Sequence, residues 1–308
     1  MKTLKLVPQE TNVDFMRMRF IGYIVSALVI FGSFALLGVK GLNLGVDFTG
    51  GTLIEIQVQK APNIPELRTH LDALDLGDIS LQEFGAPNDL LLRLGQQPGG
   101  EDEQKAAIEK VRTSIDKFFA DQTVDYRRVE YVGPQVGEEL KRAGLLAFVL
   151  SMLGIMAYMW YRFEWQFGVG AVLALFHDSI GVLGYFALTG KAFDLSTLAA
   201  VMLVAGYSIN DTVVVYDRIR ENLRKFKKMP FKDLFNLSVN QMLSRSIMTS
   251  LTTVIVLVVL WLLGGEVIRS FAEALIFGIF LGTFSSIYVA APILELLRLP
   301  RGSSRDDG

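Results

Sequence analysis

Residues 196–222, STLAAVMLVAGYSINDTVVVYDRIREN, decide how this chain folds. The stretch begins as an apolar membrane span, continues past Asn210 and Asp211 into three valines, and ends in the charged run DRIRE at 217–221. A carboxylate at the centre of a membrane helix costs about 2.5–3.5 kcal/mol on insertion scales. Because a helix that only crosses the bilayer would not carry this cost, the pattern predicts that Asp211 is a functional residue on an ion or proton path. The alternative is a buried aspartate that fixes helix packing through a hydrogen bond to a neighbour.

Composition is typical of an integral membrane protein. Hydrophobic residues make up 51% of the 308 residues and the mean hydropathy is +0.38, which is too apolar for a soluble domain of this length. The chain has no cysteine and two histidines, His70 and His177, which excludes a thiolate nucleophile, a cysteine-based metal site and a histidine-rich metal centre. The H-E-x-x-H and G-x-S-x-G motifs are absent from the sequence as well. We therefore expect no enzyme activity and no cofactor.

Six apolar stretches are long enough to cross a bilayer, whose hydrocarbon core takes about 20 helical residues. The first covers residues 20–39 and follows a polar, basic segment at 1–19. It is longer than the apolar part of a signal peptide and lacks an A-x-A-like exit, so we expect an uncleaved span. The other five lie within residues 141–298, at about 143–160, 167–188, 196–216, 246–264 and 271–297.

Residues 40–140 break this hydrophobic pattern and predict a water-soluble domain. Strand and helix signals follow one another in the order β-α-β-β-α-β, the split βαβ pattern of ferredoxin-like domains. The apolar phase of the last strand slips between Tyr126 and Val129, so we expect a β-bulge near Arg127 and Arg128. The predicted fold class is an α-helical polytopic membrane protein of six transmembrane helices, with an α+β ferredoxin-like extracytoplasmic domain between helices 1 and 2.

Basic residues predict the orientation in the membrane. Seven of them lie between Arg218 and Lys232, and others precede the first span and follow the last one. By the positive-inside rule, both termini, the loop at 217–245 and the tail at 299–308 are expected in the cytoplasm. Apolar side chains after Pro230 trace one helical face and predict an interfacial helix within this loop. A solvated loop is the alternative for the charge run at 224–228.

Arg245 stands at the cytoplasmic entry of the fifth predicted span, and Thr249, Thr252 and Thr253 share its helical face. Asp211 is expected in the cytoplasmic half of its own span. The two opposite charges are therefore at compatible depths and can pair. The alternative for Arg245 is snorkelling of its side chain to the lipid headgroups.

His177 and Asp178 lie near the middle of the third predicted span, where both side chains need partners. A proton relay is one interpretation, since aspartate and histidine chains serve this purpose in pumps; a helix-packing hydrogen bond is the other. A ridge of small residues in the sixth span predicts close helix packing: Gly278, Gly282, Ser286 and Ala290. The candidates for a proton pathway are therefore Asp211, Arg245, Asn210, Thr249, Asp178 and His177.

Four motifs in this sequence resemble the SecF family, the smaller subunits of the SecD–SecF protein-export complex of the bacterial cytoplasmic membrane. They are GVDFTGG at 45–51, VGPQVG at 132–137, HD at 177–178 and GYSINDTVVVYDRIRE at 206–221. The resemblance covers nearly the whole chain, and the last motif is long and specific. The family belongs to the resistance-nodulation-division (RND) superfamily of proton-driven transporters.

The resemblance implies pairing with SecD in a twelve-span unit beside the SecYEG channel and the SecA motor, with YajC as a further partner. It implies that the proton motive force moves extracytoplasmic domains, which help an unfolded preprotein to emerge. It assigns proton transport to the aspartate of the N-D-T motif and an arginine of the following span, here Asp211 and Arg245. Two alternatives stay open: a small-molecule exporter of the same superfamily, and a non-transporting scaffold of the channel.

Overall fold

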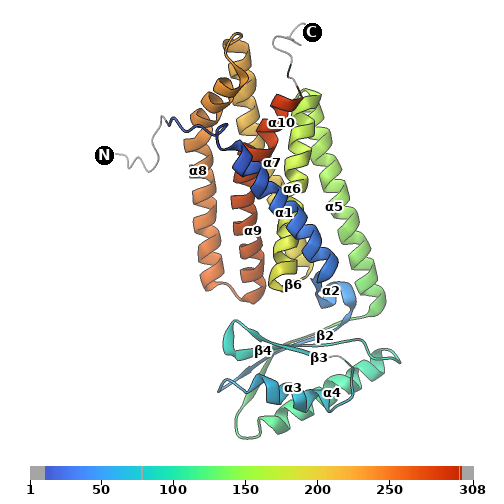
Figure 1. Cartoon of the computed structure of the whole chain (residues 1–308). Helices are drawn as coiled ribbons and strands as arrows, with labels where there is room; N and C mark the ends of the chain where they lie inside the picture. The colour runs from blue at the N-terminus through green and yellow to red at the C-terminus, as the bar shows by residue number, and fades with distance from the viewer. Residues whose placement is uncertain (1–10, 78, 298, 300–308) are drawn as a thin grey trace. The chain divides into compact units, whose positions relative to one another are not determined.

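The computed structural model describes residues 11–77, 79–297 and 299. The part of the predicted N-terminal segment before residue 11, and the predicted tail from residue 300, lie outside the described residues. The chain divides into two compact units, which we call the membrane unit (residues 1–43, 148–191 and 196–308) and the sheet unit (residues 44–147 and 192–195). Figure 1 shows the elements of both.

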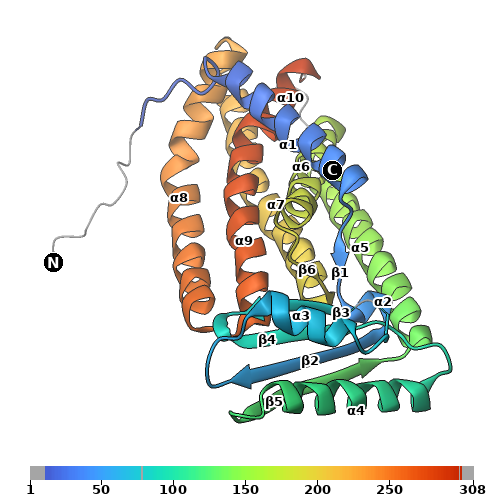
Figure 2. The same ribbon diagram turned by 60° about the horizontal axis from the view of Figure 1, so that its bottom comes forward.

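Six helical spans in the described part of the chain are long and apolar enough to cross a membrane. They are α1 (Arg19–Val39), α5 (Pro134–Arg162), α6 (Trp165–Thr189), α7 (Leu195–Lys225), α8 (Phe231–Leu263) and a sixth span made of α9 (Glu266–Ser285), the π-helical segment η1 (Ser286–Ala290) and α10 (Ala291–Leu296). Within the bundle, α1 packs on α6, and α8 stands beside α9 at one edge (Figures 1 and 2). The prediction of six transmembrane helices is confirmed.

The segment at 217–245, predicted as a loop, is mostly helical. The helix α7 continues to Lys225 and α8 begins at Phe231, so residues 226–230 form the connection. The predicted interfacial helix and the fifth span are therefore one continuous helix of 33 residues. Leu234 and Phe235 in its first turns are buried in the cluster that includes Tyr216 and Ile219 of α7. An apolar helical face fits a neighbouring helix as well as a membrane surface, which explains why the sequence pattern was misleading here.

The sheet unit has the predicted ferredoxin-like order. Its main elements are α2 (Val46–Thr49), β2 (Gly51–Val58), α3 (Ile64–Asp72), β3 (Ile79–Phe84), β4 (Ala86–Leu94), α4 (Glu101–Phe118) and β5 (Val124–Val132). The antiparallel strands follow the order β3-β4-β2-β5, and α3 and α4 pack on one face of this sheet (Figure 1). Alternate residues of β2, Ile54, Ile56 and Val58, enter the core and are at most 1% exposed.

The predicted β-bulge is confirmed in β5. Glu55 of β2 pairs with Arg128, and the next residue, Ile56, pairs with Tyr126, which leaves Arg127 as the extra residue. A second, two-stranded sheet of β1 (Asn43–Leu44) and β6 (Ala192–Phe193) was not predicted. Strands of two residues are too short to produce a detectable period in the sequence.

Gly50 and Gly51 form the turn from α2 into β2. Their φ angles are +70° and +113°, and a Cβ on Gly51 would lie 2.5 Å from the carbonyl oxygen of Leu94. Both observations require glycine, since other residues are strained at these angles and a backbone oxygen cannot move aside easily. Asp47 of α2, which precedes this turn, holds the start of α7, because the Leu195 amide donates to its Oδ2 at 3.0 Å.

The small-residue ridge of the sixth span packs closely on α7, as predicted. A Cβ on Gly278 would lie 2.1 Å from Cγ2 of Val204, and one on Gly282 would lie 3.0 Å from Cβ of Ser208. Further along the span, the hydroxyl oxygens of Ser286 and Thr212 are 2.9 Å apart. This contact lies at the start of η1, and π-helical turns are frequent at functional sites.

Candidate functional site

Asp211 lies inside the helix bundle at the end of a chain of hydroxyl groups. Its residue is 2% exposed, and its Oδ2 accepts a hydrogen bond from Oγ1 of Thr283 at 3.2 Å. The hydroxyls of Thr283 and Ser250 are 3.1 Å apart, and the hydroxyl of Tyr207 donates to Ser250 at 3.4 Å. Since the proton of Thr283 points to Asp211, Ser250 donates to Thr283. Every donor in the chain therefore points towards Asp211, and the chain links α7, α8 and α9.

A small cavity adjoins the same carboxyl group. Its volume is about 10 Å³, and besides Asp211 it is lined by residues that include Ser246, Met242, Thr283 and Ser286. A cavity of this size has room for about one water molecule, and Asp211, Ser246, Thr283 and Ser286 offer it hydrogen-bond partners within an otherwise apolar lining. Asp211 thus has a proton-donating chain on one side and a water-sized cavity on the other.

Asp178 of α6 has a different and more complete set of partners. It is 0% exposed and accepts hydrogen bonds from Ser285 at 2.7 Å, from Ser208 at 2.5 Å and from Nδ1 of His177 at 2.9 Å. These contacts join α6, α7 and α9, as expected for a buried carboxylate that is fully satisfied. His177 is 2% exposed, and its Nε2 is buried without a hydrogen-bond partner in the described part of the chain.

The remaining predicted site residues lie on the surface of this single chain. Arg245, Thr249 and Asn210 are all exposed. The Thr249 hydroxyl donates within its own helix, to the carbonyl oxygens of Arg245 and Ser246. Within residues 11–77, 79–297 and 299, no ion pair joins Asp211 to Arg245, so the structure does not contain the predicted contact.

Sequence reasoning missed the hydroxyl groups that hold both carboxylates, and it missed a polar cluster around Glu273. That carboxylate pairs with Lys191 and accepts hydrogen bonds from Nε1 of Trp261 at 2.8 Å and from the Tyr185 hydroxyl at 3.2 Å. Serine and threonine are common in membrane helices, so their presence alone carries no signal. The four-residue spacing of Gly282 and Ser286, which brings α9 close to α7, was the available hint.

The fold and these buried groups define a class: a polytopic membrane protein with a ferredoxin-like domain between its first two spans and hydrogen-bonded carboxylates inside its bundle. Residues 111–299 match the family described as protein export membrane protein SecD/SecF, C-terminal. Residues 35–62, which contain the Gly50–Gly51 turn, match the SecD/SecF GG motif. The chain belongs to the SecD/SecF family of protein-export membrane proteins.

Individual relatives agree with this assignment. The protein translocase subunit SecF of Rickettsia felis is 44% identical over 293 residues, which are 95% of this chain and 94% of the relative. The SecF of Rickettsia prowazekii is 43% identical over 293 residues, which are 95% of this chain and 93% of that relative. The crystal structure of SecDF from Thermus thermophilus superposes with a TM-score of 0.84 at 34% identity, over 95% of this chain and 40% of that longer one. The chain is thus a multi-pass inner-membrane protein and a subunit of the protein translocase, with a SecD partner.

Proposed function

We propose that this chain, together with SecD, uses the proton motive force to assist late stages of preprotein export across the cytoplasmic membrane. The observation that carries the proposal is the setting of Asp211, where aligned hydroxyl donors and a water-sized cavity meet one carboxyl group. Such a group can take up and release a proton, which a carboxylate held by a full set of donors does less readily. Further partners in this proposal are SecYEG, SecA, YajC and the unfolded preprotein.

Exposed polar side chains on the spans support a contact with SecD at this site. Arg245, Thr249 and Asn210 are exposed although their helices are apolar enough to cross the membrane. Charged groups within spans usually face a bundle interior or a partner rather than lipid. We place SecD over these residues, so that Arg245 becomes enclosed beside Asp211 in the complex.

Helix movement couples proton release to work in this mechanism. An approaching guanidinium favours the charged carboxylate, so a shift of α8 that brings Arg245 towards Asp211 expels the proton. One charge moving through the membrane potential yields about 2.3 kcal/mol per 100 mV. Reversing a two-state population from 1:99 to 99:1 needs about 5.5 kcal/mol. More than one proton per cycle, or a contribution from the bound polypeptide, is therefore required.

Basic residues support the proposed orientation. Arg224 and Lys225 at the end of α7, and Lys227 and Lys228 in the connection to α8, favour a cytoplasmic location for this end of the bundle. With six spans, we then expect both termini on that same side. The sheet unit, between the first and second spans, is then extracytoplasmic, where a preprotein emerges.

Export of a secretory reporter in cells depleted of their own SecD and SecF tests the proposal. Each strain receives a matched SecD with this chain, with Asp211→Asn, or with the control Asp233→Asn, an exposed carboxylate at the start of α8. We expect rescue by the wild-type chain and by the control, and loss of rescue with Asp211→Asn at equal membrane levels. Rescue by all three favours a scaffold, and rescue by none calls for a small-molecule efflux assay.

A further inference from the structure

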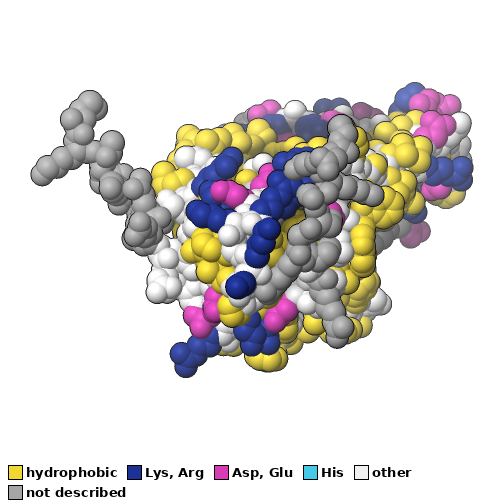
Figure 3. Space-filling view, turned by 90° about the horizontal axis from the view of Figure 1, so that it is seen from above, with side chains coloured by type: hydrophobic (Ala, Val, Ile, Leu, Met, Phe, Trp, Pro, Cys, Tyr) yellow, Lys and Arg dark blue, Asp and Glu magenta, His cyan; other side chains and the backbone are white. Residues whose placement is uncertain are grey.

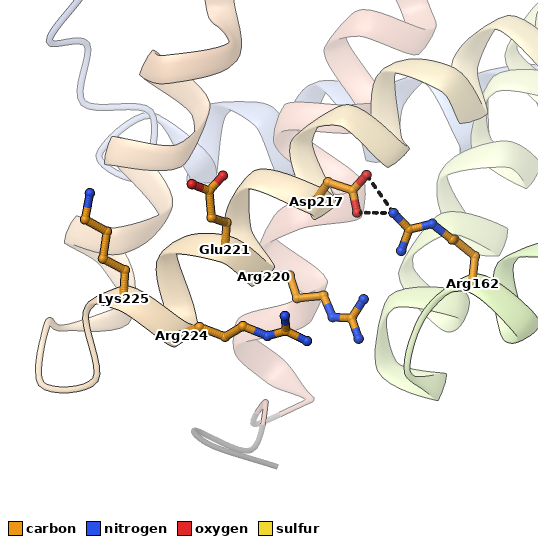
Figure 4. Close-up of a pocket in the computed structure, with 6 residues that line it drawn as sticks. All are labelled: Arg162, Asp217, Arg220, Glu221, Arg224 and Lys225. Atoms are coloured by element: carbon orange, nitrogen blue, oxygen red, sulfur yellow. Dashed lines mark hydrogen bonds and ion pairs between the residues drawn. The ribbon is translucent and has the colours of Figure 1, made fainter. Parts of the chain in front are cut away.

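A hollow of about 580 Å³ opens where α5 ends beside α7 (Figure 4). Six charged side chains line it: Arg162, Asp217, Arg220, Glu221, Arg224 and Lys225. One of them comes from the last residue of α5 and the others from the last turns of α7. The hollow therefore belongs entirely to the membrane unit and is separate from the site around Asp211.

The two acidic residues of this hollow are already engaged. Asp217 accepts hydrogen bonds from Arg162 at 3.0 and 3.2 Å, and Glu221 accepts one at 2.8 Å from Arg218, which does not line the hollow. Four cationic side chains against two anionic ones leave a net charge of +2 in the lining. Such a lining favours an anion that has several oxygen atoms.

Arg220 is poorly matched by the protein itself. Its Nε is buried without a hydrogen-bond partner in the described part of the chain, and its contact with Glu164 is 3.9 Å long. Figure 4 shows the guanidinium groups of Arg220 and Arg224 reaching towards the side on which Arg162 of α5 lies, while Lys225 and Glu221 extend upwards in this view. Guanidinium groups bind phosphate through paired hydrogen bonds.

Two observations indicate that the hollow lies at the depth of the lipid headgroups. A helix of 31 residues, as in α7, is about 46 Å long, whereas the hydrocarbon core measures about 30 Å, so the last turns of α7 extend beyond it. Around the end of α5, Trp160, Tyr161 and Trp165 are 58%, 92% and 60% exposed. Exposed tryptophan and tyrosine mark the membrane–water interface. Seen from this end of the bundle, Lys and Arg side chains gather between hydrophobic flanks (Figure 3).

We propose that this hollow binds the headgroup of an anionic phospholipid. Its phosphate diester lies between Arg220 and Arg224, with Arg162 closing the far side. The acyl chains run along the outer face of α5, where Leu150 and Leu153 are 57% and 48% exposed. Basic pockets between transmembrane helices on the cytoplasmic side are suited to such headgroups.

Tryptophan quenching by brominated lipids tests this site in the full-length chain, because Trp160 and Trp165 lie close to Arg162 in the sequence. The purified protein in neutral detergent is titrated with phosphatidylglycerol or phosphatidylcholine of identical brominated acyl chains. We expect phosphatidylglycerol to quench at a roughly tenfold lower mole fraction, and Arg220→Gln with Arg224→Gln to abolish this preference. The control, Lys228→Gln with Lys232→Gln, removes the same charge from exposed residues outside the lining and keeps the preference.

Other outcomes would overturn the proposal. Equal loss in the control variant would mean a general charge effect, and a preference that survives in the Arg220/Arg224 variant would place the lipid elsewhere. Displacement of the lipid by glycerol 3-phosphate at equal concentration would indicate a site for soluble phosphates, and displacement by an acidic peptide would indicate a protein partner. Arg220→Lys with Arg224→Lys guards against misfolding: it keeps the charge, loses the paired hydrogen bonds and should show a weaker but measurable preference.

Discussion

Asp178 and Asp211 are both buried in the bundle, but their hydrogen bonds indicate a structural role for Asp178 and a change of protonation for Asp211. Asp178 accepts from Ser208, Ser285 and His177, whereas Asp211 accepts from Thr283 and adjoins a cavity. A carboxylate that satisfies donors from three helix positions holds those helices together. One with a single donor and space beside it can change its protonation without breaking a network.

Asparagine at either position should therefore act on different properties. Asp178→Asn keeps one oxygen for Ser208 and Ser285 but turns its amide N–H towards Nδ1 of His177 and removes the charge from all three hydrogen bonds, so it should lower the free energy of unfolding by about 1–3 kcal/mol. Asp211→Asn still accepts from Thr283 and should change stability by less than about 1 kcal/mol. Denaturation of both purified variants in detergent, monitored by circular dichroism, measures this. Equal destabilisation by the two substitutions would refute the distinction.

Asp14, which precedes the first span, helps to attach residues 11–17 to α8, and this attachment depends on pH. It accepts hydrogen bonds from Nδ2 of Asn236 at 2.8 Å and from the Arg17 amide at 3.0 Å, and these hold its pKa below the ordinary value of 3.8. Because the folded pKa is the lower one, the carboxylate stabilises the attachment of residues 11–17 to α8 fully above the unfolded pKa. This contribution is lost as the pH falls through the lowered pKa.

Hydrogen exchange of the Met16 amide, which donates to Asn236 at 3.0 Å, reports on that attachment. We expect slower exchange in the wild-type chain than in Asp14→Asn at about pH 6, and convergence of the two as the pH falls through the lowered pKa of Asp14. Comparison at each pH removes the intrinsic pH dependence of exchange. A constant ratio between the two proteins over this range would contradict the assignment.

Rare residue types explain how much of the site could be predicted. Asp178, His177 and Asp211 are conspicuous because charged groups are scarce in apolar spans. Their partners Ser208, Thr283 and Ser285 are ordinary in such helices, and only the folded bundle shows which of them face a carboxylate. Arg245 was correctly assigned to a span. Its exposure was not predicted, because it depends on how the helices pack, which the local sequence pattern does not show.

Hydropathy predicted the helices better than their ends and junctions. The six spans and the β-α-β-β-α-β order follow from periodicity alone. The continuity of α8 does not, because Phe231–Leu263 changes from an amphipathic to an apolar pattern without a break in the helix. The close approach of α9 to α7 was predictable from its small residues, but the partner helix was not.

This close approach predicts the effect of a single methyl group. Gly278→Ala places a Cβ 2.1 Å from Cγ2 of Val204, which is 0% exposed, and should lower the free energy of unfolding by about 1–3 kcal/mol. Val204→Ala in the same chain should recover at least about 0.5 kcal/mol of that loss in a double-mutant cycle. Gly206→Ala on α7 is the matched control, since nothing lies within 4 Å of its new Cβ. A Gly278 variant as stable as this control would contradict the packing.

At the scale of the whole molecule, the number of spans determines which parts share a side of the membrane. The sheet unit contains Lys60, the α7–α8 connection contains Lys228, and three spans, α5, α6 and α7, lie between them in the chain. An odd number of crossings puts the two residues on opposite sides. In the orientation we propose, the basic connection lies in the cytoplasm and the sheet unit lies outside it.

The chain has no cysteine, so single cysteines at these exposed positions report their side directly. In cells with a permeabilised outer membrane, a membrane-impermeant maleimide should label Lys60→Cys at once and Lys228→Cys only after lysis. Inverted vesicles should give the reverse result. Labelling of both cysteines from one side would contradict the count of spans. Labelling of Lys228→Cys alone before lysis would show that the orientation is the reverse of the one we propose. Inversion would also defeat the proposed export function, because the sheet unit would then face away from the emerging preprotein.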